Sequence, residues 1–300
     1  MKWIKSILLG LLVVLVVFIG VQYIQYIRSV NQVKADLPGE SIVAETVHGP
    51  VEYFIQGESN QYVLLIHGTP GSYRTFMADV LLNHGFTIIS PSRPGYFRTP
   101  LSSGKTIDAQ ADLYAALLDH LSIDSAAIIG FSGGGPSALK FASQYTNRCS
   151  GLVVIASTGR PFEEPSRPLM ENMMMGTEFG RWMGYGAMTS QFEAADTGEI
   201  ALDYLRSGFF PSEQIQTGER NDFQQFASQW KVNLTSIQCP TLIIHGKEDE
   251  LIPFSEAIHL NNEIPKSSLI AKEGKDHFSV VFFEFDKSLK MAADFLNDHL

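Results

Sequence analysis

Short apolar runs alternate with helical patterns along the chain from residue 42 to the C-terminus. From the third run on, several consist only of Val, Ile and Leu, which is typical of parallel strands covered on both faces. The clearest helical pattern spans residues 107–123, where Leu113, Ala116, Leu117 and Leu121 form one apolar stripe. This alternation predicts an α/β fold: a mostly parallel, eight-stranded sheet with helices on both faces. The expected strands are residues 42–47, 51–55, 62–66, 86–89, 126–130, 152–156, 242–244 and 268–271.

The alternation is interrupted between residues 159 and 234, which carry prolines, methionines and aromatic helical stretches but no strand pattern. A structureless loop of that length is unusual inside a compact domain. We therefore expect a helical cap at residues 159–234, inserted between two parts of the core at residues 42–158 and 235–300.

The N-terminal segment is apolar and is followed by a polar connector. Residues 6–27 carry no charge, and the continuous apolar stretch at 7–21 is extended by Tyr and Ile to the roughly 20 residues that a bilayer requires. We expect a transmembrane anchor at residues 1–30 that contacts the bilayer through residues 6–27, followed by a linker at 31–41. A cleaved signal peptide is the alternative, but no small-x-small motif directly follows the apolar run. The flanking positive charges favour a single-pass protein with its globular part on the extracytoplasmic side.

Composition and charge exclude some classes of partner. The 300 residues have a formal net charge of −10, and no basic face is visible for a nucleic-acid backbone. Cys149 and Cys239 are too few for a disulfide scaffold and lack zinc-site spacing. Each precedes one of two strands expected to be neighbours, so a single bridge between them is conceivable. We expect no metal and no cofactor.

The segment GFSGGGP, residues 130–136, joins an expected strand to an expected helix. Its G-x-S-x-G spacing places Ser132 on a tight turn where the hydroxyl stands clear of the sheet. The start of the following helix points the N–H of Gly133 at any developing negative charge. A glycine-rich helix entry without catalysis is the alternative interpretation.

A second glycine- and proline-rich turn, HGTPGS at residues 67–72, follows the third expected strand. It is positioned to supply another backbone N–H, that of Thr69, and two such donors make an oxyanion hole. For His67 we expect a structural role in bracing this loop.

A serine hydroxyl needs an adjacent base, and the base needs a carboxylate that holds its tautomer. Downstream, KEDELIP follows the seventh expected strand and EGKDHFSV follows the eighth. The order Ser132, Asp249, His277 matches the order of nucleophile, acid and base in one known hydrolase arrangement.

Over roughly residues 42–300 the chain resembles the α/β-hydrolase fold superfamily, because HGTPGS, GFSGGG, HGKEDELIP and GKDHF occur in the right order at strand ends. The resemblance implies that Ser132 is the nucleophile, Asp249 the acid and His277 the base. It also implies that Thr69 and Gly133 donate the oxyanion-hole N–H groups. The family spacing from Gly246 selects Asp249 over its neighbours Glu248 and Glu250, and Asp276 points away from the adjacent His277.

The family match has one departure, in the segment SRPGYFRTPL at residues 92–101. Ser92 stands where the family often has aspartate, and Phe97 stands where it often has glycine. Neither position belongs to the three catalytic candidates, so the departure concerns the conformation of this loop.

A serine nucleophile implies acyl transfer to water, as in carboxylesterases, and disfavours the ester-forming displacement of relatives that use aspartate. Proline-iminopeptidase-like cleavage and cofactor-free perhydrolase chemistry use the same fold and are alternatives. A membrane-bound binding or signalling protein is the non-enzymatic alternative.

The expected substrate is a small molecule with a hydrophobic acyl group, because methionine and aromatic residues are frequent in the cap and adapt to irregular shapes. These residues could equally pack the cap onto the core. The candidate substrate-binding residues are Phe131, Met174 and Trp182.

Overall fold

The computed structural model describes residues 2–35, 39–76, 79–162, 176–184 and 211–300. Eight strands form one sheet in the order β1-β2-β4-β3-β5-β6-β7-β8. The pairs β1–β2 and β2–β4 are antiparallel, and all other neighbouring pairs are parallel. The predicted mostly parallel, eight-stranded sheet is therefore confirmed. The strands are β1 (Ile42–Thr46), β2 (Gly49–Gln56), β3 (Tyr62–Ile66), β4 (Thr87–Pro91), β5 (Ala126–Phe131), β6 (Cys149–Ile155), β7 (Thr241–Gly246) and β8 (Ser267–Lys272).

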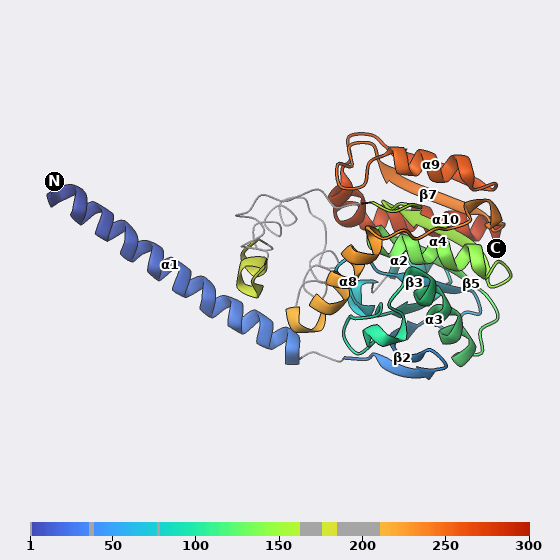
Figure 1. Ribbon diagram of the computed structural model, residues 1–300, viewed down its shortest axis with the longest axis horizontal. Coiled ribbons are helices and arrows are strands. Elements are labelled where there is room, and N and C mark those ends of the chain that lie inside the picture. Colours follow the sequence, from blue (N-terminus) through green and yellow to red (C-terminus); the bar gives the residue numbers. More distant parts are fainter. Residues whose placement is uncertain (1, 36–38, 77–78, 163–175, 185–210) are drawn as a thin grey trace.

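Helices cover both faces of the sheet (Figure 1). One apolar core contains residues of α2 and α10, and the other contains residues of α3, α4 and α9. The α-helices are α1 (Lys2–Ala35), α2 (Asp79–Asn83), α3 (Ile107–His120), α4 (Gly135–Gln144), α8 (Gln216–Phe226), α9 (Ser255–Glu263) and α10 (Phe285–His299). Shorter helical turns are η1 (Tyr73–Phe76), η2 (Leu101–Ser103), η3 (Ser132–Gly134), η4 (Ser212–Gln214), η5 (Leu234–Ser236) and η6 (Ser279–Phe283).

The two cores follow directly from the alternation of side chains along each strand. In β3, Val63 and Leu65 enter one core, and Leu64 and Ile66 enter the other. All four are fully buried, which explains why this strand is an unbroken apolar run. The parallel strands β3 to β8 end at one edge of the sheet, and the loops that follow them meet there.

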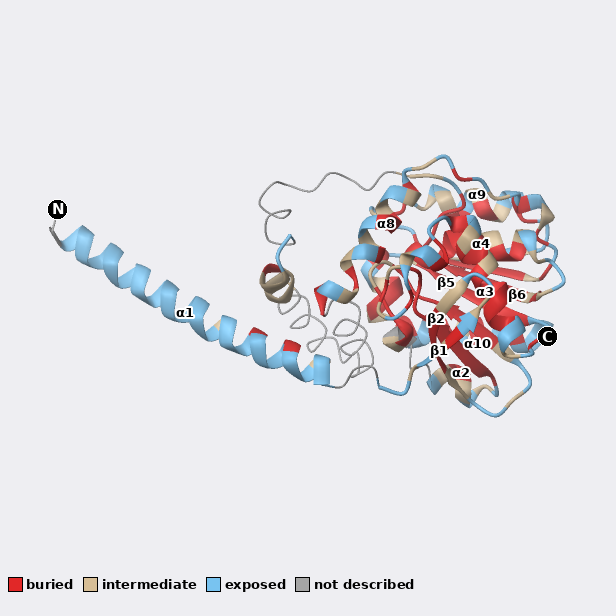
Figure 2. Ribbon diagram, turned by 60° about the horizontal axis from the view of Figure 1, so that its bottom comes forward, coloured by how far each residue is buried: buried red, intermediate tan, exposed pale blue. Residues whose placement is uncertain are grey.

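Helix α1 projects away from the sheet, and only its last turns lie beside the rest of the chain (Figure 1). Its most apolar stretch has a mean hydropathy of 2.8, and α1 is long and apolar enough to cross a membrane. The helix runs to Ala35 and so continues into the expected linker at residues 31–41. Within residues 3–35, Tyr26 and Val30 are the two buried side chains (Figure 2).

The last turns of α1 pack against a short helix at residues 178–184. The ring of Tyr26 lies 5.5 Å from that of Phe179 and 6.1 Å from that of Trp182, measured between centroids. The Tyr26 hydroxyl donates to Oε2 of Glu178 at 3.1 Å. This contact joins the N-terminal helix to the segment that the sequence predicts to be the cap.

Cys149 begins β6, and Cys239 lies two residues before β7, the strand next to it in the sheet. Their Sγ atoms lie 3.5 Å apart, and both thiols are buried and free. The strands expected to be neighbours are neighbours, and the two thiols lie in contact without a bond between them.

Candidate active site

Ser132 occupies the sharp turn between β5 and α4. Its φ angle is +43°, a left-handed conformation that a residue other than glycine rarely adopts. The turn requires glycine on both sides of Ser132, because there is no room for a Cβ at Gly130 or Gly134. A Cβ on Gly130 would lie 2.6 Å from Cβ of Ala138, and one on Gly134 would lie 2.5 Å from the carbonyl oxygen of His67. The turn leaves Ser132 half-buried at the edge of the sheet where the parallel strands end.

The structure brings Ser132, His277 and Asp249 together in one hydrogen-bonded line. The Ser132 hydroxyl donates to Nε2 of His277 at 3.0 Å. On the other side of the ring, Nδ1 of His277 donates to Oδ2 of Asp249 at 2.8 Å. This tautomer leaves Nε2 as the acceptor that a proton transfer from the serine requires.

Asp249 follows β7 in a tight turn. Its Oδ1 accepts hydrogen bonds from the backbone N–H groups of Leu251 and Ile252, at 3.0 and 2.7 Å. Burial alone would raise the pKa of Asp249, but hydrogen bonds from His245, His277 and the Ile252 N–H outweigh it and lower that pKa. Asp249 is therefore ionised and fixed in orientation. Its neighbours Glu248 and Glu250 are exposed, and so is Asp276.

His245, at the end of β7, also belongs to this site, although the sequence analysis did not select it. Its ring is fully buried, and Nε2 lies 3.3 Å from Oδ2 of Asp249. The same nitrogen donates to the carbonyl oxygen of Ile252 at 2.8 Å. His245 thus holds the Asp249 turn from the sheet side. The histidine-glycine pair at a strand end was the available signal.

Thr69 and Gly133 lie side by side next to Ser132. A Cβ on Gly133 would collide with Oγ1 of Thr69 and approach Cζ of Phe226 to 3.0 Å. The Thr69 side chain therefore occupies the space beside the α-carbon of Gly133, and the two residues predicted to supply N–H groups are neighbours. Two backbone donors beside a nucleophile can stabilise an oxygen that becomes negative during attack on a carbonyl.

His67 braces the loop that carries Thr69, in the way expected for it. The imidazole is fully buried; Nδ1 donates to the Gly68 carbonyl at 2.8 Å, and Nε2 accepts from the Arg93 N–H at 2.9 Å. Burial, together with the nearby Arg93 charge, lowers the pKa of His67 well below its ordinary value. The ring is neutral, and both of its nitrogens are occupied by these two bonds.

A buried ion pair lies behind Thr69 and was not foreseen from the sequence. Nη2 and Nη1 of Arg93 donate to Oδ1 and Oδ2 of Asp222, at 2.7 and 2.9 Å. Arg93 follows β4 and Asp222 lies on α8, inside the segment predicted as the cap. Each side chain is about 1% exposed. The pair joins α8 to the loops at the edge of the sheet.

Phe226, at the end of α8, provides an apolar wall beside Gly133 in the turn after β5. It is buried, and its ring stacks on that of Phe162 with centroids 5.3 Å apart. The backbone N–H of Phe162 donates to the Phe226 carbonyl at 3.0 Å. The two ends of the predicted cap segment are thereby tied together close to Gly133.

The three residues predicted to bind substrate have different outcomes. Phe131 is fully buried in the core and stacks on Phe285 with centroids 5.3 Å apart, so its side chain does not face a substrate. Trp182 packs against Tyr26 of α1. Met174 lies outside the described residues. The position of Phe131 follows from strand alternation, because it shares its face of β5 with Ala127 and Ile129.

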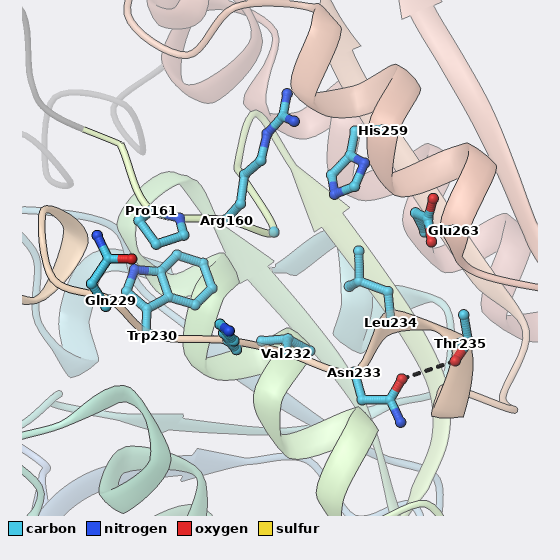
Figure 3. A pocket seen from close by; sticks show the side chains of 12 residues that line it. Arg160, Pro161, Gln229, Trp230, Val232, Asn233, Leu234, Thr235, His259 and Glu263 are labelled. Atoms are coloured by element: carbon cyan, nitrogen blue, oxygen red, sulfur yellow. Dashed lines mark hydrogen bonds between the residues drawn. The ribbon is translucent and has the colours of Figure 1, made fainter.

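A surface pocket of about 390 Å³ lies where the chain leaves the core after β6 and returns to it before β7 (Figure 3). It contains none of Ser132, Asp249 and His277, so we do not assign it to the site. Arg160 at its rim is paired with Glu256 by a 2.7 Å contact. The remaining lining residues are Gly159, Pro161, Gln229, Trp230, Lys231, Val232, Asn233, Leu234, Thr235, His259 and Glu263.

Within the described ranges, no three His, Cys, Asp or Glu side chains gather in a way that could hold a metal ion.

Comparison with known proteins bears on the fold. A family model described as the alpha/beta hydrolase fold matches residues 61–202. YcgS, an uncharacterised hydrolase of Bacillus subtilis, is 29% identical over 239 residues, covering 72% of this chain and 84% of that protein. A bifunctional esterase/perhydrolase of Acinetobacter calcoaceticus, DCH, is 25% identical over 237 residues, covering 70% and 83%.

Among solved structures, an alpha/beta hydrolase fold protein from Nakamurella multipartita is 29% identical. It superposes with a TM-score of 0.75 over 85% of this chain and 98% of its own. Sheet order and these relatives lead to one conclusion: this chain has the α/β-hydrolase fold, which it shares with proteins named as hydrolases.

Proposed function

We propose that the protein is a serine hydrolase, similar to carboxylesterases, that cleaves a carboxylic ester through an acyl-enzyme on Ser132. The observation that carries the proposal is the 3.0 Å contact between the Ser132 hydroxyl and Nε2 of His277, whose Nδ1 is held by Asp249. A weak nucleophile thus has a base in reach, and the base has its tautomer fixed.

The reaction then has two halves. His277 takes the Ser132 proton as the oxygen attacks the carbonyl carbon, and the N–H groups of Thr69 and Gly133 stabilise the oxyanion. The tetrahedral intermediate collapses, His277 returns the proton to the departing alcohol, and the acyl group stays on Ser132. Water, deprotonated by His277, attacks the acyl carbon and releases the acid, with the proton restored to Ser132.

The wall made by Phe226 and Phe162 supports a hydrophobic acyl group, because apolar side chains beside the nucleophile favour burial of apolar substrate surface. Perhydrolysis, in which hydrogen peroxide replaces water as the acyl acceptor, is the second candidate. The name of the Acinetobacter relative, an esterase and perhydrolase, favours it.

We further propose that α1 anchors the protein in a bilayer through residues 6–27, with the hydrolase domain on the extracytoplasmic side. The helix is supported by its length, and the exposure of its most apolar stretch leaves that surface without protein cover. Retention in the membrane pellet after alkaline carbonate extraction tests the anchor. Protease protection of residues 39–300 in spheroplasts would contradict the sidedness.

A fluorophosphonate probe tests the central proposal. The full-length protein in detergent is expected to be labelled at Ser132, and Ser132→Ala is expected to remain unlabelled. No labelling of folded wild-type protein would contradict the proposal and would support a ligand-binding protein on the same fold.

Assays with different substrates distinguish ester hydrolysis from iminopeptidase-like cleavage and from perhydrolysis. We expect turnover of p-nitrophenyl esters of graded chain length and little turnover of aminoacyl p-nitroanilides, whose cleavage would instead indicate an iminopeptidase-like activity. Peroxyacid formation when hydrogen peroxide is added would support the second candidate.

A further inference from the structure

Asp222 accepts hydrogen bonds from three different side chains at once. The Thr69 hydroxyl donates to its Oδ2 at 2.6 Å, and the Tyr96 hydroxyl donates to the same oxygen at 2.6 Å. Arg93 donates to both carboxylate oxygens. Thr69 and Asp222 are 153 positions apart, so only the docking of α8 onto the core brings them together.

Arg93 holds the rest of the oxyanion loop. Its Nη1 donates to the Gly68 carbonyl at 3.3 Å and to Oγ1 of Thr69 at 3.2 Å. Its backbone N–H donates to the imidazole of His67. Residues 67, 68 and 69 are therefore each held by Arg93, and residue 69 is held by Asp222 as well. These bonds fix the Thr69 side chain, the Gly68 carbonyl and the His67 ring.

Arg93 and Asp222 are both buried, and their opposite charges pair with each other. Burial raises the pKa of Asp222, while the Arg93 guanidinium and the hydroxyls of Thr69 and Tyr96 oppose that rise. A buried pair of this kind adds little net stability relative to apolar side chains of similar size. It does fix geometry, because separating the partners would leave an unpaired buried charge.

We propose that Asp222 is a positioning residue for the oxyanion hole. By holding the Thr69 hydroxyl, it directs the Thr69 N–H toward the oxygen that becomes negative in the tetrahedral intermediate. Docking of α8 is then a condition for acyl transfer, and the segment predicted as the cap takes part in catalysis through Thr69. This inference rests on the proposed serine hydrolase function.

The experiment changes only the hydroxyl. Thr69→Val keeps the backbone N–H and nearly the same side-chain volume but removes the bond to Asp222, while Thr69→Ser retains a hydroxyl. For Thr69→Val we expect kcat for a p-nitrophenyl ester to fall about tenfold to a hundredfold, below the effect of losing a donor outright. KM should change little. Binding of an alkyl trifluoromethyl ketone, which forms a tetrahedral oxyanion with Ser132, should weaken by the same factor. Thr69→Ser should restore both.

Asp222→Asn should act in the same direction as Thr69→Val, because the amide loses the charge that orients Arg93. Glu256→Gln is the matched control: it breaks another cap-side ion pair, with Arg160, at the surface pocket and away from Thr69. It should leave ketone binding unchanged. Thermal unfolding of each variant checks that it is folded.

The outcomes are distinguishable. If fluorophosphonate labels wild type and folded Thr69→Val binds the ketone as tightly as wild type, the positioning role is wrong and the proposed function stands. If folded wild type is not labelled at all, the proposed function and this inference fall together.

Discussion

The Ser132 hydroxyl lies 3.0 Å from Nε2 of His277, although 145 positions separate the two residues. Ser132 follows β5 and His277 follows β8, and both strands run parallel and end at the same edge of the sheet. The sheet order therefore determines which distant loops meet. Strands β6 and β7 lie between β5 and β8 and set the distance between the ends of those two strands.

Neutralising the acid should remove most activity. Asp249→Asn is expected to lower kcat by about 10⁴-fold, because the amide no longer selects the tautomer in which Nε2 of His277 accepts a proton. Ester hydrolysis by full-length protein measures the effect. Glu250→Gln, at the exposed neighbour, is the control and should retain wild-type kcat. An equal loss in both variants would contradict the assignment of Asp249.

The Asp249 carboxylate should also make the free energy of unfolding depend on pH in the acidic range. The pKa of Asp249 is lowered in the folded protein, so its ionisation stabilises the fold above its unfolded pKa, and this contribution is lost as pH falls below about 4. Urea unfolding should show wild type more stable than Asp249→Asn at pH 7. The difference between them should shrink as pH falls through that range. A difference that is constant with pH would mean that the carboxylate is not stabilised in the folded state.

Phe226 should set acyl-chain preference. Phe226→Ala removes a ring beside Gly133 and leaves apolar space that a longer acyl chain can fill, so we expect the ratio of kcat/KM for a long-chain over an acetyl p-nitrophenyl ester to rise about tenfold or more. Phe131→Leu is the comparison, because that ring lies in the core against Phe285, and the ratio should not change. The opposite pattern would return the substrate-binding role to Phe131.

The two thiols should form a bridge when oxidised. With Sγ atoms already 3.5 Å apart, treatment with diamide is expected to remove two hydrogen atoms from the mass and leave no titratable thiol after denaturation. The loop between Cys149 and Cys239 is long, so its closure should stabilise the fold by about 4 to 5 kcal/mol in the chain-entropy account. Cys149→Ser should show neither effect. Two free thiols after oxidation of the wild type would contradict this prediction.

The sheet could be predicted from the sequence because its strands are buried on both faces and therefore appear as short unbroken apolar runs. The positions of Ser132, Asp249 and His277 could be predicted because each lies in a short motif directly after such a run. The structure brings these three residues together, and their catalytic roles stay predictions.

The missed features depend on packing between distant segments. Arg93, Asp222 and Phe226 acquire their roles only when α8 docks, and no local pattern marks them. The contact of Trp182 with Tyr26 of α1 likewise joins segments far apart in the sequence, and no local pattern marks it. Phe131 was a different case, since the two-residue alternation along β5 already indicated its core position.

The contact between α1 and the 178–184 helix also bears on how the protein can be handled. Tyr26 covers the rings of Phe179 and Trp182, so the end of α1 is part of the surface of that short helix. A shortened version that starts after Ala35 would uncover Phe179 and Trp182 and lose the hydroxyl that binds Glu178. Such a fragment exposes aromatic side chains that the intact chain covers, and this surface favours aggregation. Full-length protein in detergent or nanodiscs is therefore the appropriate material for every measurement proposed above.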